Sequence, residues 1–210
     1  MSLFKKIFDK QDQPEKIDLS DILYTTPTLE NTFPEVEYTY SSTFKGLTVH
    51  EDDWRQIEFV STSLIELALE EVDSIRRIFE EQSKEIEVGL VFKETHLRTK
   101  IPKPLAPPFS IQSLEKHFHD IQYGDYGFYD GSRAKFGREI NTLGFQLYAI
   151  VIDNIVQVLG FHGLNSWDKL DEFKKCLKTF MEDQDLVIVD WRARLIISPN
   201  ELDNYLVEKE

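Results

Sequence analysis

The sequence contains a single cysteine, Cys176, among its 210 residues. Disulfide scaffolds and thiolate metal clusters need several cysteines, so both classes are excluded. A chain of this kind suits a reducing compartment, and we expect a cytoplasmic protein. No apolar run reaches the roughly 18 residues that a membrane-spanning helix needs, and the first residues lack the pattern of a secretory signal peptide.

Basic residues are few, since 24 Lys and Arg stand against 38 Asp and Glu, for a formal net charge of −14. Nonspecific affinity for nucleic acid depends on cations that contact phosphates, so we expect no nucleic-acid partner. Hydrophobic residues make up 41% of the chain and aromatic residues 12%. This composition supports a sizeable core and is too apolar for a disordered chain.

Signatures of catalysis are missing as well. No serine lies in a G-x-S-x-G motif, and Gly124, Gly127 and Gly131 are not spaced as a phosphate-binding loop. His117 and His119 lie two residues apart on an expected helix, where their side chains point to nearly opposite sides. The sequence therefore predicts no catalytic residue, no cofactor and no metal site.

The chain divides into a lead-in segment, 1–35, which we expect to be partly flexible, and a single domain, 36–210. Met1–Lys10 has apolar residues at helical spacing between lysines, but it is too short to make membrane contact the expected role. Four prolines in 98–108 predict a stiff connector and a subdomain seam.

Strands are predicted at 36–40, at 47–49 pairing back on 36–40, at 54–60 and at 88–92. A helix is predicted over 64–84, because the capping box Ser63–Glu66 precedes an apolar stripe of Ile65, Leu69, Val72, Ile75 and Phe79. A short helix is predicted over 111–121, followed by an ordered loop or hairpin tip over Tyr123–Gly131.

Two apolar runs, Leu143–Ile152 and Ile155–Phe161, predict a central hairpin that turns at Asp153 and Asn154. A helix opening at 165 or 166 is expected next, then a strand over 186–189 that continues or bends into 195–197. A capping box at Ser198–Glu201 predicts a last helix to about residue 207. This order is typical of an α+β fold in which helices pack on a mainly antiparallel sheet.

One short motif occurs twice. Asp53-Trp54-Arg55 is followed six residues after its arginine by Ser61, and Asp190-Trp191-Arg192 is followed at the same distance by Ser198. Each copy leads into a β-rich run and a helix, so the chain is interpreted as containing two related strand-helix units, with coincidence as the alternative.

Charge is distributed unevenly along the chain. Residues 51–87 hold 12 acids and 4 bases, whereas residues 93–138 hold 8 bases and 5 acids. A surface of one sign steers a partner of the opposite sign, so we expect an acidic face that attracts a basic protein.

The leading hypothesis is a non-enzymatic protein-binding domain, of the inhibitor or immunity type, for a basic partner. Tryptophan and arginine dominate the energetics of interfaces. The predicted partner-binding residues are therefore Glu51, Asp52, Asp53, Trp54, Arg55, Trp191 and Arg192.

Two alternatives stay open. One is a small hydrolase-like enzyme with a site in Tyr123–Arg138, which would use Asp125, Asp130, Arg133 or Arg138. The other is a homodimer or larger scaffold in which the hairpin at Leu143–Phe161 pairs across a two-fold axis.

Overall fold

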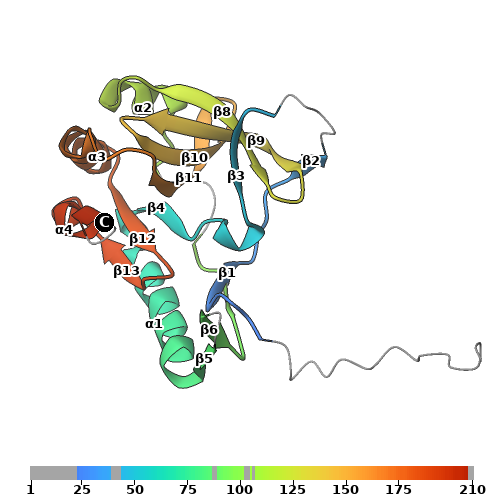
Figure 1. Cartoon of the computed structure of the whole chain (residues 1–210). Helices are drawn as coiled ribbons and strands as arrows, with labels where there is room; N and C mark the ends of the chain where they lie inside the picture. Colours follow the sequence, from blue (N-terminus) through green and yellow to red (C-terminus); the bar gives the residue numbers. More distant parts are fainter. Residues whose placement is uncertain (1–22, 39–43, 87–88, 102–104, 106, 208–210) are drawn as a thin grey trace, which may run out of the picture.

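The computed structural model describes residues 23–38, 44–86, 89–101, 105 and 107–207. Within these residues a nine-stranded, mainly antiparallel sheet forms the centre of the molecule, and helices cover parts of both faces (Figure 1). The predicted α+β class is therefore confirmed. None of the described helices is long and apolar enough to cross a membrane. The lysine-bearing segment Met1–Lys10 lies outside the described residues.

The strands of the central sheet come from the whole length of the described chain. In spatial order they are β13 (Leu195–Ile197), β12 (Leu186–Asp190), β4 (Ile57–Ser61), β11 (Ile155–Leu164), β10 (Phe145–Ile152), β9 (Ser132–Thr142), β8 (Gln122–Phe128) and β3 (Gly46–Val49), with β2 (Val36–Tyr38) beside one end of β9. All pairs are antiparallel except β3 with β8. The expectation that 47–49 pairs back on 36–40 is therefore wrong, because β3 pairs with β8 whereas β2 pairs with β9.

Two small sheets lie beside the first helix, α1 (Ile65–Gln82). One pairs β1 (Thr28–Glu30) in parallel with β7 (His96–Arg98), and the other pairs β5 (Ser83–Ile86) with β6 (Gly89–Phe92). In Figure 1 these strands and α1 form a part that extends below the main sheet.

The hairpin of β10 and β11 agrees with its prediction. Asp153 and Asn154 both have positive φ, 51° and 64°, as a two-residue turn of this kind requires. Both strands are central, since β9 pairs with β10 and β4 pairs with β11. The strand β9 covers β10 along 145–150, whereas β4 pairs with β11 only at Gly160. The pairing of the hairpin across a two-fold axis stays a prediction.

The segment Tyr123–Gly131 is not a loop but one strand and the tip of a hairpin, so the second of the two predicted alternatives agrees with the structure. Most of it forms β8, and the turn into β9 occupies only its last residues. Close packing accounts for two of its glycines, because a Cβ at Gly124 would lie 2.4 Å from Glu139 Oε2 and one at Gly127 would lie 2.6 Å from Ser132 O. Gly131 lies in the turn, with φ of 85°. Glycine in a strand often marks such an approach, so the content of glycine and aromatics was misleading here.

The helix α1 lies within two residues of its predicted ends, but its start and its buried face differ from expectation. Its first residue follows a 3₁₀ turn, Thr62–Leu64, where Ser61 Oγ accepts from Ser63 N, and no side chain caps α1 itself. The predicted capping box at Ser63 is therefore absent. The buried side chains are Ala68, Glu71, Val72 and Ile75, and Leu69 is 47% exposed.

Helices cover opposite faces of the sheet. On β4 and β12 alternate residues point to the two sides, as strand geometry dictates. Val60, Val187 and Val189 pack with α1, whereas Phe59, Leu186 and Ile188 pack with the helices on the other face. Those helices are α2 (Ile111–His117), α3 (Leu170–Asp183) and α4 (Leu202–Val207).

The two strand-helix units therefore place their helices on opposite faces, α1 after β4 and α4 after β13. The similarity of their sequences does not extend to their packing. The strand β13 turns back to pair with β12 rather than continuing it. Glu201 accepts from the backbone N and Oγ of Ser198, at 2.9 and 2.6 Å, which is one half of the capping box predicted before α4. Glu201 N donates to Ser198 O rather than to its hydroxyl.

Glu71 is the unexpected member of the buried face of α1. Its Oε1 accepts from Thr99 N at 2.9 Å and Lys100 N at 2.7 Å, and its Oε2 contacts His96 Nε2. Burial disfavours the charged carboxylate, but the donors of His96, Thr99 and Lys100 outweigh that effect and lower the pKa of Glu71. This carboxylate holds the chain after β7 against the helix.

Gly160 on β11 offers a test of packing in the sheet. A Cβ there would lie 2.1 Å from Tyr148 Cζ, so we expect Gly160→Ala to lower the free energy of unfolding by about 1–3 kcal/mol. Gly163→Ala on the same strand is the control, because nothing lies within 4 Å of its Cβ position. Urea unfolding measures both, and equal midpoints for the two variants would contradict the packing described.

Glu71 gives a prediction about acid. Because its folded pKa is lowered, its contribution is complete above the ordinary glutamate value of about 4.3 and is lost as pH falls through the folded value. We therefore expect the wild type to lose stability below about pH 4.3 more steeply than Glu71→Gln does. The control is Glu70→Gln, at an exposed neighbour on α1. If Glu71→Gln keeps the wild-type slope in urea titrations across this range, the assignment is wrong.

Candidate functional site

The two Asp-Trp-Arg segments, although Asp53 and Asp190 are 137 residues apart in sequence, lie side by side. The antiparallel register of β4 with β12 places Asp190 opposite Ile57, and Trp191 N donates to Gln56 O at 2.9 Å. We call residues 51–56 together with 190–193 the double corner. The structure thus brings together all the residues that the sequence predicted for partner binding.

Three of those residues are buried rather than exposed. Trp54 is 2% exposed and Trp191 fully buried, and each indole N–H has an internal acceptor. Trp54 Nε1 donates to Thr32 O at 2.9 Å, and Trp191 Nε1 donates to Glu58 Oε1 at 2.8 Å. Arg55 is likewise buried. These side chains support the corner from inside, because large aromatic groups gain most from burial and a buried cation needs partners.

Glu58 connects the two segments. Its Oε2 accepts from Arg55 Nε at 2.5 Å, and its Oε1 accepts from Trp191. Arg55 Nη1 also lies 3.0 Å from Glu30 Oε2, so β1 is tied to β4 through a buried ion pair. The arginine of the first segment and the tryptophan of the second therefore share one carboxylate.

A second buried arginine completes this network. Arg98 Nη1 donates to Thr28 Oγ1 at 2.8 Å and Nη2 donates to Arg55 O at 2.9 Å. Its guanidinium carbon lies 5.1 Å from the ring centre of Trp191. Two arginines and two glutamates, Arg55, Arg98, Glu30 and Glu58, thus form a buried cluster with no formal net charge.

Burial acts differently on the two arginines. It disfavours the charge of Arg55, but Glu58 and Glu30 outweigh burial, so the pKa of Arg55 is raised. In Arg98, which has no carboxylate in direct contact in the described structure, burial dominates and lowers the pKa to about 10. Arg98 remains a cation at neutral pH, and the two glutamates compensate its charge from a greater distance.

The exposed part of the double corner is charged. Arg192 Nη2 pairs with Asp53 Oδ1 at 2.7 Å and reaches Asp52 O at 3.5 Å, so the second segment also contacts the acidic 3₁₀ turn Glu51–Asp53. Asp190 lies behind this pair, where Oδ1 accepts from Ala193 N and Oδ2 accepts from Tyr205 OH.

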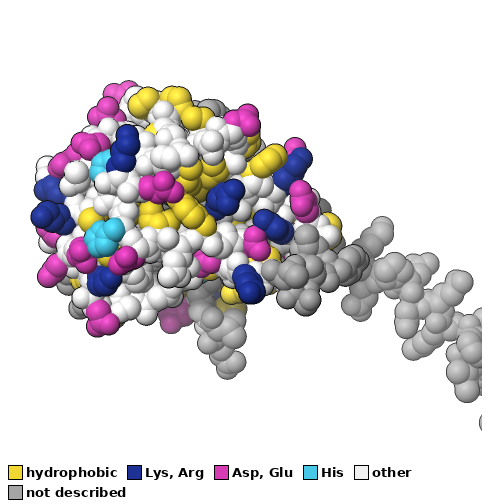
Figure 2. Space-filling model, turned by 90° about the horizontal axis from the view of Figure 1, so that it is seen from above, with side chains coloured by type: hydrophobic (Ala, Val, Ile, Leu, Met, Phe, Trp, Pro, Cys, Tyr) yellow, Lys and Arg dark blue, Asp and Glu magenta, His cyan; other side chains and the backbone are white. Residues whose placement is uncertain are grey.

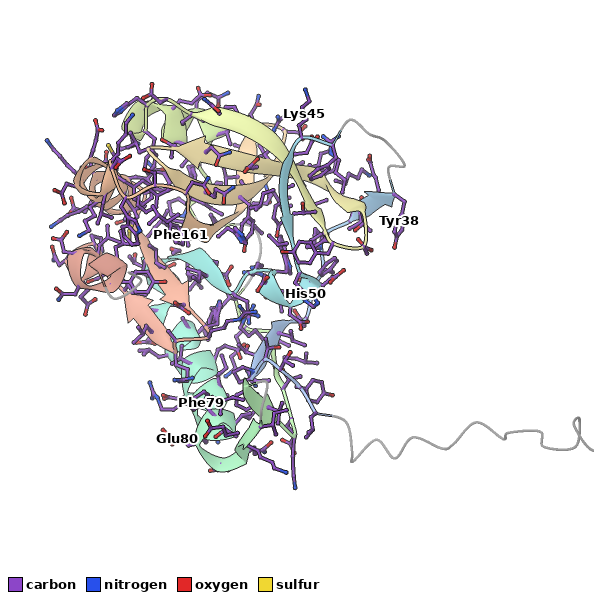
Figure 3. The ribbon with its side chains drawn as sticks, in the orientation of Figure 1. Tyr38, Lys45, His50, Phe79, Glu80 and Phe161 are labelled. Carbon is purple, nitrogen blue, oxygen red and sulfur yellow. The ribbon has the colours of Figure 1, made fainter. Side chains whose placement is uncertain are left out.

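A hollow of about 290 Å³ lies between the two segments. It is lined by Asp53, Gln56, Ile57, Phe161, His162, Asp190, Arg192 and Ala193. Burial lowers the pKa of His162 in spite of the nearby carboxylates Asp53 and Glu139, which favours the neutral ring at neutral pH. Figure 3 labels Phe161 on the β11 side of this region and His50 just before the acidic turn.

Of the predicted binding residues, Glu51, Asp52, Asp53 and Arg192 are at least partly accessible to a partner. The sequence analysis missed Glu58, Glu30, Arg98, Gln56 and His162. Glu58 carried a usable signal, because it is the only charged residue in the apolar run 57–61. Glu30 and Arg98 had none, since their roles depend on the pairing of β1 with β7.

The acidic excess of residues 51–87 lies in two places rather than on one face. One group is the turn Glu51–Asp53, and the other is the exposed side of α1 with β5, which carries Glu66, Glu70, Asp73, Glu80, Glu81 and Glu85. Figure 3 shows His50, beside the first group, and Glu80, in the second, well apart. The face seen in Figure 2 carries both signs of charge around an apolar patch.

The carboxylates proposed for a hydrolase-like site do not converge. Asp125 Oδ1 pairs with Arg133 at 2.7 Å, and Asp130 Oδ1 accepts from Ser132 N at 2.7 Å. Arg138 lines a separate hollow with Tyr123, whose hydroxyl donates to Glu115 and whose pKa burial and Glu115 raise to about 12. Within the described residues, no three His, Cys, Asp or Glu side chains are placed to hold a metal ion.

Comparison with known proteins gives no assignment, since no protein-family model, no curated protein and no solved structure matches the chain. The function of the double corner has to be inferred from its own geometry.

The buried cluster predicts a large effect at Glu58. Glu58→Gln keeps an acceptor for Trp191 but leaves Arg55 and Arg98 with one carboxylate, so we expect a loss of about 3–5 kcal/mol in the free energy of unfolding. The control is Asp73→Asn, which removes an exposed pair with Arg76 and should cost less than about 1 kcal/mol. Urea unfolding at neutral pH compares them.

Should Glu58→Gln fail to fold, Glu30→Gln tests the same cluster from its other carboxylate, whose side chain is 4% exposed. A loss at Glu30 and Glu58 no larger than at Asp73 would contradict the view that this cluster holds the corner together.

Proposed function

We propose that this chain is a non-enzymatic binding domain for a basic protein, of the inhibitor or immunity type, and that it contacts its partner through the double corner. The observation that carries the proposal is the convergence of two distant Asp-Trp-Arg segments on one charged, partly exposed site. Both segments bury their tryptophan, while the first presents the acidic turn 51–53 and the second presents Arg192 at the surface.

The cost of the supporting cluster favours a functional site. A buried ionic cluster is seldom more stabilising than apolar side chains of similar volume, so its presence needs another reason. Arg55 also adopts a left-handed backbone conformation, with φ of 53°, which is unfavourable for a residue other than glycine. The hydrogen bonds and ion pairs of Arg55 and Gln56 hold the backbone next to the acidic turn 51–53, and a preorganised turn lowers the entropic cost of binding.

Charge supports a basic partner. The net charge of −14 attracts cations over the whole molecule and raises the rate of encounter, while the local fit at the corner determines how long a complex lasts. A reducing compartment, the cytoplasm, is part of the proposal, because Cys176 is free.

Affinity capture tests this proposal. The tagged protein, incubated with lysate of its source cells, should retain a basic protein at low salt and lose most of it at high salt. The variant Glu51→Gln/Asp52→Asn/Asp53→Asn should retain at least about tenfold less, because it removes three charges at the site. The matched control Glu80→Gln/Glu81→Gln/Glu85→Gln removes as many charges from the α1 region and should still retain the basic protein.

The captured protein is then purified and its affinity for each variant is measured directly. If the wild type retains no basic protein at either salt concentration, the proposal is wrong. Equal losses in the two triple variants would do the same for the site, since they would show attraction by overall charge alone.

A further inference from the structure

Gln56 lines the hollow of the double corner and has an unusual hydrogen-bond state. It is only 3% exposed, and its Oε1 has no donor among the described residues. Its Nε2 donates to Thr28 O at 3.0 Å and to Asp52 O at 2.7 Å. Two carbonyl acceptors fix the orientation of the amide, since a flip would turn Oε1 toward both of them. A buried acceptor without a donor is costly. Oε1 is itself shielded from solvent, so a donor from outside reaches it only when the neighbouring Arg192 side chain moves away.

Arg192 marks where such a donor would enter. Its Nη2 reaches the same Asp52 O that accepts from Gln56, so the guanidinium and the amide are neighbours. The pair that Arg192 forms with Asp53 has side chains 45% and 30% exposed. Ion pairs at this level of exposure contribute little, so an incoming cation can replace Arg192 at Asp53.

We infer that the hollow accepts an arginine side chain of the basic partner, which takes Asp53 from Arg192 and donates to Gln56 Oε1. This inference rests on the proposed function. A guanidinium suits the hollow better than an ammonium, because it offers five donors in a planar fork and its flat face can lie against Phe161, which lines the hollow with Ile57. The carboxylate of Asp190, behind the pair, adds to the attraction for a cation.

Arg192 then acts as an internal competitor for the site. Its removal leaves Asp53 without its cation and should strengthen the binding of an external guanidinium. Removal of Asp53 should weaken that binding. Opposite effects from the two members of one ion pair distinguish this site from attraction by net charge.

The test uses the purified full chain and two peptide probes, hexa-arginine and hexa-lysine, in isothermal titration calorimetry. Hexa-arginine should bind about tenfold more tightly than hexa-lysine. Asp53→Asn should weaken hexa-arginine about tenfold, and Arg192→Ala should strengthen it severalfold. The matched controls are Asp73→Asn and Arg76→Ala, which change the same charges in an exposed pair on α1. Each control should change the affinity for hexa-arginine by less than about twofold.

Equal affinity for the two peptides would overturn the inference, as would equal effects at Asp53 and Asp73 or unchanged binding by Arg192→Ala. Circular dichroism of each variant verifies the fold, and if Asp53→Asn does not fold, Arg192→Ala against Arg76→Ala decides alone. The two proposals fail separately. If capture of a basic protein depends on residues 51–53 but the chain shows no preference for hexa-arginine, the proposed function stands and the inference is wrong. If the wild type captures no basic protein, the proposed function itself is wrong.

Discussion

The hydrogen bonds that the carboxylate of Glu58 accepts from Arg55 and Trp191 are the interaction on which the rest of the molecule depends. Glu58 lies on β4, between β11 and β12, and accepts from a neighbouring cation, Arg55, and from the distant indole of Trp191. Through Arg55 it reaches Glu30 on β1, and beside Arg55 lies Arg98 on β7. The small parallel sheet is thus fastened to the large sheet by charge and hydrogen bonds as well as by apolar packing.

In this arrangement the residues that position the backbone of the corner differ from those that are exposed at its surface. The buried side chains, Trp54, Arg55 and Trp191, set the positions of the backbone, and the accessible ones, Asp53 and Arg192, meet the solvent. Of the motif that was interpreted as a binding surface, only Asp53 and Arg192 are therefore open to a partner. Under the proposed function its tryptophans would aid recognition without touching a partner, because a preorganised site loses less entropy on binding.

The elements that could be predicted from the sequence were those specified locally. The positive φ that Asp153 and Asn154 tolerate fixed a two-residue turn, and the apolar runs around it predicted central strands. Elements that depend on distant partners could not be predicted in this way. The glycines of β8 suit a loop until β9 and β3 are placed beside them, and Glu71 has no visible partner until β7 approaches α1.

The same division holds at the candidate site. The repeat of one motif, together with the weight of tryptophan and arginine in interfaces, singled out the two Asp-Trp-Arg segments. Nothing local indicated that the segments would exchange partners, with Arg192 on Asp53 and Trp191 on Glu58. That exchange follows from the register of β4 with β12, which strand periodicity does not specify.

The pairing of β4 with β12 also has a consequence for the order of folding. The two strands lie far apart in sequence, and contacts of such long range form slowly because a large loop must close first. During synthesis β4 emerges long before β12, so Glu58 and Arg55 at first lack the contact with Trp191 and the pairing of β4 with β12. The double corner is therefore incomplete until residues 186–193 have been synthesised.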